Sequence, residues 1–171
     1  MQVTVRFLAR LADRLIERHG ARVVFIPHHC LTGRDKVILT DLEVARAITR
    51  AMRHPEGTAV LPENLHPFAA MNAYRKLDLV VSMRHHANSF AYRFGVPTIG
   101  CAISEKVVRH FRQVQQEALL VDPLDPDPAK ADRVVDDAVR NRRALSDDLK
   151  TRLVAAKAVM SRTMETVLDS V

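Results

Sequence analysis

Cysteine, glycine and tryptophan are scarce in this 171-residue chain, which has two cysteines, five glycines and no tryptophan. Two cysteines are too few for a disulfide scaffold, and Cys30 and Cys101 lie beside apolar stretches, so we expect buried thiols in a reducing compartment. The glycines form no Gly-x-Gly-x-x-Gly loop, which argues against a dinucleotide-binding fingerprint. No apolar run approaches the roughly 20 residues that cross a bilayer. We therefore expect a cytoplasmic protein with no integral membrane segment.

Two further protein classes lack their signatures. Neither Ser82 nor Ser104 lies in a Gly-x-Ser-x-Gly elbow, so a serine hydrolase is not expected. We recognise no nucleic-acid-binding module and expect no nucleic-acid partner. The net charge of +6 and the pI of about 9.8 suit an anionic ligand or a polyanionic acceptor, although an arginine-rich composition alone would give the same excess.

Strand and helix patterns alternate along residues 1–122, which predicts an α/β domain with a parallel sheet and crossover helices. A hydrophobic content of 47% is enough for one core. Residues 123–128 are a proline-rich linker, because prolines forbid regular structure there. Residues 129–171 are expected to form helices packed on the same domain, and an apolar stripe in the last one could cover the sheet or a second copy of the chain.

The elements can be placed from hydrophobic periodicity and from helix start and stop signals. Residues 3–5 could be a short strand or the start of the first helix. Asp41 and Ser146 are the expected N-caps of two later helices. The expected strands are 22–26, 58–61, 77–82, 98–102 and 118–121, and the later helices are 42–53, 67–75, 84–94, 106–116, 129–142 and 147–168.

The most informative segment begins at an apolar strand, Leu77–Ser82, that runs directly into Arg84, His85 and His86. A short amphipathic helix follows, and Gly95 with Pro97 stops it. In a parallel α/β sheet the carboxyl ends of the strands form the crevice where ligands bind, and the N–H groups of the next helix attract anions. We expect Arg84 and His86 to converge on one solvent-reachable cavity.

Arginine and lysine side chains at this edge suggest an anion site. The planar guanidinium of Arg84 matches a carboxylate or a phosphate, although a surface ion pair with an acidic residue is the alternative. Lys106 follows the next strand and could reach the same pocket. His86 can give and take a proton near neutral pH, although a capping or buried hydrogen-bonded histidine is the alternative.

Two more histidines, His28 and His29, follow the strand at 22–26. At least one of them is expected to line the same crevice, with a weak preference for His28, against an ordinary loop role. His85 and His86 do not suggest a metal site, because adjacent helical residues do not face one way. We expect neither a metal nor a cofactor.

Together, Asp78 at the strand, Arg84-x-His86, Gly95-Val96-Pro97 and Lys106 resemble the C-terminal half of the polysaccharide pyruvyl transferases. In the run after the Gly-Val-Pro strand, Ile103 stands where the family has an aromatic residue, and only Lys106 carries over.

An upstream stretch also resembles the family: the strand at 23–26 with His28 and His29, followed by Asp35 and Asp41. The resemblance runs from about residue 3 to residue 122. It implies a Rossmann-like parallel sheet with helices on both faces, similar to one half of a glycosyltransferase-B fold, plus the C-terminal helices.

The family resemblance implies transfer of a pyruvyl group from phosphoenolpyruvate to a sugar of a surface polysaccharide. His86 would then be the general acid, with Arg84 as a second catalytic residue, and Arg84, Lys106, His28 and His29 would bind the substrate. The other half of the architecture would come from an N-terminal partner domain or from a homodimer. Two alternatives are the donor-binding half of a nucleotide-sugar glycosyltransferase and a non-catalytic domain that binds anions or glycans.

Overall fold

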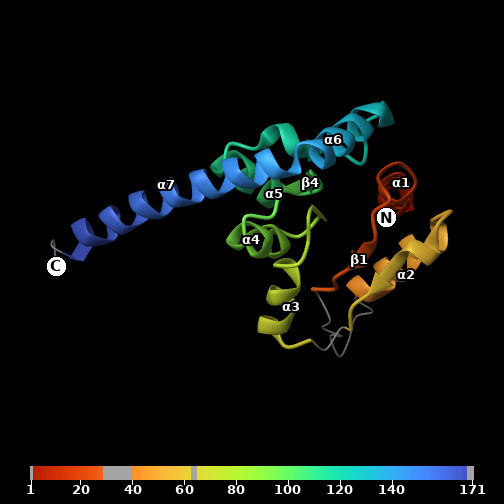
Figure 1. The fold of residues 1–171 in the computed structure, drawn as a ribbon, viewed down its shortest axis with the longest axis horizontal. Coiled ribbons are helices and arrows are strands. Elements are labelled where there is room, and N and C mark those ends of the chain that lie inside the picture. The colour runs from red at the N-terminus through yellow and green to blue at the C-terminus, as the bar shows by residue number, and fades with distance from the viewer. Residues whose placement is uncertain (1, 29–39, 63–64, 169–171) are drawn as a thin grey trace.

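The computed structural model describes residues 2–28, 40–62 and 65–168, which form a mixed α/β structure with small parallel sheets (Figure 1). The helices are α1 (Gln2–His19), α2 (Asp41–Ala51), α3 (Pro67–Tyr74), α4 (His85–Arg93), α5 (Glu105–Gln113), α6 (Pro128–Arg140) and α7 (Arg142–Leu168). The strands are β1 (Val23–Phe25), β2 (Thr58–Val60), β3 (Val80–Ser82), β4 (Thr98–Cys101) and β5 (Leu120–Val121). The α/β class and the parallel strand direction are confirmed.

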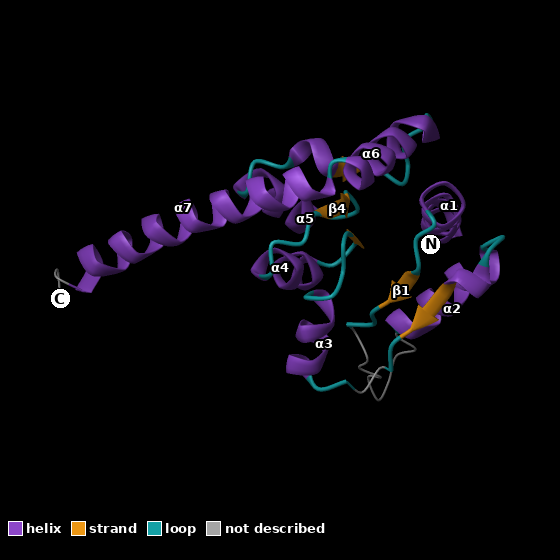
Figure 2. Ribbon diagram, in the orientation of Figure 1, coloured by secondary structure: helices purple, strands orange, loops and turns teal. Residues whose placement is uncertain are grey.

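The strands form two sheets instead of the one continuous sheet that the alternation predicts. β1 pairs with β2, and β3, β4 and β5 pair in that order (Figure 2). Within the described residues no ladder joins β1 to β3, and a cavity of about 800 Å³ is lined by both strands. Strands of two to four residues offer few ladder hydrogen bonds, so helix packing holds the two sheets together.

Helix α1 packs on both sheets, and residues 2–5 belong to it instead of forming a strand. Phe7 and Leu11 join the core that covers β4 and β5, whereas Ala9 and Ala12 pack toward α2 and β1. Leu8 contacts both groups. One amphipathic helix thus bridges the two sheets.

Ion pairs fasten α1 to α6. Arg14 donates to both carboxylate oxygens of Asp136, at 2.9 and 2.5 Å, and Arg18 and His19 contact the same carboxylate. Asp136 is 8% exposed, and its guanidinium partner Arg14 holds the pKa of its carboxyl well below the usual range. Arg10 pairs with a second α6 carboxylate one turn earlier.

The centre of the three-stranded sheet is tightly packed. Gly100 in β4 lies so close to Phe111 and Leu120 that a Cβ atom at position 100 would fall 2.4 Å from a Phe111 ring carbon. Phe111, Ile99 and Cys101 are fully buried, and burial raises the pKa of the Cys101 thiol to about 12. The expected buried thiol is therefore confirmed for Cys101, and Cys30 lies outside the described residues.

The structure corrects two of the expected helix caps. Thr40, and not Asp41, caps α2: its hydroxyl accepts from Glu43 N, and Glu43 reaches back to Thr40 N. Ser146 lies inside α7, where its hydroxyl donates to the Gly95 carbonyl at 2.7 Å. Residues 143–146 therefore continue a helix, and Ser146 ties that helix to the turn before β4.

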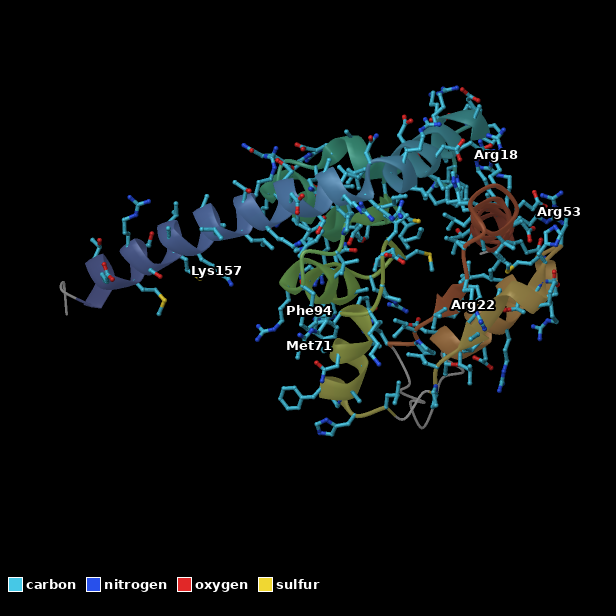
Figure 3. All side chains as sticks on the ribbon, in the orientation of Figure 1. Arg18, Arg22, Arg53, Met71, Phe94 and Lys157 are labelled. Atoms are coloured by element: carbon cyan, nitrogen blue, oxygen red, sulfur yellow. The ribbon has the colours of Figure 1, made fainter. Side chains whose placement is uncertain are left out.

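Helix α7 is long, and its second half extends away from the rest of the molecule (Figure 1). Leu149 is fully buried, but the later apolar residues Val154, Val159, Met160 and Met164 are exposed. Lys157 marks the start of the projecting half in Figure 3. Among the residues that the structure describes, no helix combines the length and apolar composition of a membrane span.

Candidate functional site

The candidate site lies where β1 and β3 end. His28 comes shortly after β1, and Arg84 is the residue before α4, which begins three residues after the end of β3. Two hydrogen bonds of Ser82 fix this turn: the buried Ser82 hydroxyl accepts from Arg84 N at 3.0 Å and donates to Arg84 O at 2.9 Å. The geometry of the strand-to-helix turn is therefore set by the last residue of β3.

The Arg84 side chain is paired with Asp41. Its Nη2 atom lies 2.5 Å from Asp41 Oδ1, and the Arg84 side chain remains 49% exposed. The ion pair that the sequence left as an alternative is thus present. Because Asp41 belongs to the first turn of α2, this contact joins the helix after β1 to the turn after β3.

The other oxygen of Asp41 supports the chain after β1. Asp41 Oδ2 accepts from His28 N at 3.0 Å. One carboxylate therefore orders both the cation at the β3 end and the backbone at the β1 end.

His28 is surrounded by aromatic residues. Its Nε2 atom lies 2.5 Å from the hydroxyl of Tyr74, and its ring lies 5.7 Å from the rings of both Tyr74 and Phe90. Burial lowers the pKa of His28; Asp41 opposes this shift, while electrostatic interactions with His86 and Arg84 add to it. The imidazole is therefore favoured in its neutral form.

His86 lies on the exposed first turn of α4, close enough to act electrostatically on His28. Its ring contacts that of His85 at 5.0 Å, and His85 contacts the ring of His110 at 5.2 Å. Burial, with a smaller effect of His85, lowers the pKa of His110. A row of three imidazoles thus runs from the site edge toward α5.

The cavity between the two sheets receives some of the expected residues. His28 and Arg84 line it, together with Asp41, Tyr74 and Ser82, whereas His86 is not among its lining residues. Apolar side chains of β1, β3 and α1 line the remainder. Arg84 and His28 therefore meet at one cavity, whereas the expected convergence of His86 on the same cavity is not seen, because His86 is exposed on the first turn of α4 and does not line it.

Two other expected site residues are not brought to this group. Lys106 is exposed in the first turn of α5, and in the described part of the chain no hydrogen bond or ion pair links it to Arg84 or His86. His29 lies outside the described residues.

Sequence reasoning missed Tyr74 as a site residue, and it gave Asp41 a capping role and a place in the family resemblance but no role in the site. A signal existed for Tyr74: it is a polar aromatic residue at the end of a helix that leads directly into the motif strand. Asp41 could have been noted as an acidic residue that opens the helix after β1, where its carboxylate reaches the carboxyl edge of the sheet.

Residues 3–105 match the family described as polysaccharide pyruvyl transferase, a segment that spans more than half of the chain and includes β1, β3, Arg84 and His86. No curated protein and no solved structure matches the chain.

Proposed function

Because this chain belongs to the polysaccharide pyruvyl transferase family, we propose that it transfers a pyruvyl group from phosphoenolpyruvate to a sugar of a surface polysaccharide. The donor site is the edge formed by Arg84, His28 and His86. The reaction takes place in the cytoplasm, where phosphoenolpyruvate is available.

One observation carries this assignment: the guanidinium of Arg84 already binds a carboxylate, that of Asp41. Asp41 Oδ1 contacts Arg84 Nη2 at the turn before α4, so the position accepts an anion of this geometry. The α4 N-terminus adds N–H groups that favour negative charge. A donor bearing a carboxylate and a phosphate would replace the Asp41 contact with its own.

The chemistry requires an acid beside these cations. Protonation of the methylene carbon of phosphoenolpyruvate makes the adjacent carbon electrophilic, and two hydroxyls of the acceptor sugar add there while the C–O bond to phosphate breaks. The products are a pyruvate ketal and inorganic phosphate; one hydroxyl proton compensates for the proton given to carbon, and the other leaves with phosphate. His86, exposed beside Arg84, is the proposed acid.

Neutral His28 and cationic Arg84 would have different tasks in this step. Arg84 would balance the charge of the donor anion, and its loss would weaken donor binding. His28 would donate a hydrogen bond without adding a charge. Lys106 and His29 remain proposed contacts of the substrate phosphoenolpyruvate.

The open side of the site suggests where the acceptor enters. Arg84 is half exposed and His86 is exposed, so this edge of the site can contact the surface of another domain or chain. We propose that this α/β unit corresponds to one half of a glycosyltransferase-B architecture. A partner domain or a second copy would supply the acceptor face.

A phosphate-release assay tests the proposal. The chain is incubated with phosphoenolpyruvate and pyruvate-free bacterial oligosaccharides, and free phosphate and ketal are measured. We expect acceptor-dependent phosphate release that is lost in His86→Ala and retained in His85→Ala, the matched neighbour.

Two results would overturn the proposal. Thermal stabilisation by a nucleoside diphosphate but not by phosphoenolpyruvate would assign the site to a nucleotide-sugar glycosyltransferase. Binding of phosphoenolpyruvate without turnover, even with an N-terminal family domain added, would leave a domain that only binds anions or glycans.

A further inference from the structure

We propose that Tyr74 is a positioning residue that fixes His28 in the tautomer with its proton on Nδ1, so that His28 presents a neutral N–H donor to the anionic donor substrate. The identity of that anion rests on the proposed function. The tautomer is a property of the protein alone, and it can be tested separately.

The direction of the hydrogen bond follows from the burial of Tyr74. Tyr74 is 2% exposed, and its hydroxyl has a single hydrogen-bond partner in the described part of the chain, His28 Nε2 at 2.5 Å. If His28 donated from Nε2, the phenol proton would be left buried without an acceptor, at a cost of about 1–3 kcal/mol. The phenol therefore donates, Nε2 accepts, and the proton of neutral His28 is on Nδ1.

Burial keeps the phenol able to donate. It raises the pKa of Tyr74 well above the ordinary value, and the nearby negative charge of Asp41 acts in the same direction. The hydroxyl thus stays protonated at neutral pH.

Packing holds Tyr74 in place. Its ring belongs to a buried cluster with Val80, Ala87, Ala91 and Val96, which connects α3 to β3 and α4. Phe90 touches both partners, with ring centroids 5.9 Å from Tyr74 and 5.7 Å from His28. The Tyr74 side chain is therefore packed against β3 and α4, the elements that position Arg84 and His86.

The charges around His28 suit a neutral donor. Asp41 from α2 fixes His28 N, while Arg84 and His86 face the ring from the β3 end and α4. A protonated His28 would add a cation to this group and break the acceptor role of Nε2. Neutral His28 can instead offer Nδ1–H to an oxygen of the anion that Arg84 neutralises.

The tautomer can be measured by NMR. Imidazole nitrogen and carbon shifts of His28, identified by their absence in His28→Gln, should show Nδ1–H at pH 7.5 in the wild type. In Tyr74→Phe, we expect a mixture of tautomers and a His28 pKa that rises toward its ordinary value. Tyr92→Phe, which removes another buried tyrosine hydroxyl, should leave His28 unchanged. An Nε2–H tautomer in the wild type, or no change in Tyr74→Phe, would overturn the inference.

Kinetics test the consequence for the substrate. With phosphoenolpyruvate as the donor, Tyr74→Phe should raise KM by about tenfold, whereas Tyr92→Phe should not, and thermal midpoints show whether either variant is unfolded. If the wild type shows no turnover, the proposed function fails, and the NMR result still decides the tautomer. If the tautomer changes but KM for phosphoenolpyruvate does not, Tyr74 does not position a donor contact and the inference is wrong.

Discussion

Arg84 and Asp41 form an ion pair across the carboxyl edge of the two sheets, with Nη2 and Oδ1 2.5 Å apart. Asp41 belongs to the helix after β1, and Arg84 to the turn after β3. The pair is therefore a direct contact between the two halves of the candidate site. It also means that an anionic substrate must compete with an internal carboxylate.

Asp41→Asn should strengthen anion binding. The amide oxygen can still accept from His28 N, but the negative charge that competes for Arg84 is gone. Because a half-exposed ion pair is worth at most about 1 kcal/mol, the gain should be up to about fivefold. Calorimetric titration with phosphoenolpyruvate measures it, and Asp137→Asn, on the exposed face of α6, is the control. Weaker binding in Asp41→Asn would show instead that Asp41 holds Arg84 in its binding position.

Gly100→Ala should destabilise the three-stranded sheet. The new methyl group would clash with the Phe111 ring and with Leu120, both part of the core. Overpacking of this kind costs about 1–3 kcal/mol. Urea unfolding measures the loss, and Gly20→Ala is the comparison: no atom lies within 4 Å of the added Cβ, but the positive φ of Gly20 imposes a cost of about 1 kcal/mol. Equal midpoints for Gly100→Ala and the wild type would contradict this packing.

Asp136→Asn should loosen the attachment of α1 to α6. The substitution removes the charge that Arg14, Arg18 and His19 share, and hydrogen bonds to charged groups are worth about 1.5–3 kcal/mol. We expect a loss of about 2 kcal/mol in the free energy of unfolding, measured in urea. Asp137→Asn removes only an exposed pair with Arg140, so its loss should be about 0.5 kcal/mol or less. Similar losses in the two variants would contradict a specific role for Asp136.

The same carboxylate predicts a pH dependence. The pKa of Asp136 is lowered in the folded state, so its stabilisation is fully present above the unfolded value near 3.9 and is lost as the pH falls below it. The difference in unfolding free energy between wild type and Asp136→Asn should be constant from pH 7 to pH 5 and shrink between pH 4 and pH 3. A difference that stays constant down to pH 3 would show that the pKa is not lowered.

Local patterns predicted the elements well because their signals lie in adjacent residues. The strand before Arg84 and the helix that ends before Gly95 both follow from short-range periodicity and stop signals. The family motif placed Arg84 at the end of a strand, and the structure places it there. The family itself was predicted from these residues and is confirmed.

The features that the sequence did not predict depend on contacts between distant parts of the chain. Thr40 and Asp41 are both good capping residues, and only the positions of His28 and Arg84 show why Asp41 is used elsewhere. Tyr74 reaches His28 across 46 positions of sequence. The division into two sheets also could not be predicted from periodicity, because the sequence pattern of a strand does not show which other strand pairs with it.

The bridging position of α1 gives the molecule a particular weak point. Leu8 contacts both groups of apolar residues, so displacement of α1 would loosen β1 from β3 and would also withdraw Phe7 and Leu11 from the core over β4 and β5. Local opening of this kind would separate His28 and Asp41 from Arg84 before the domain unfolds globally. Activity would then be lost at a lower temperature than secondary structure.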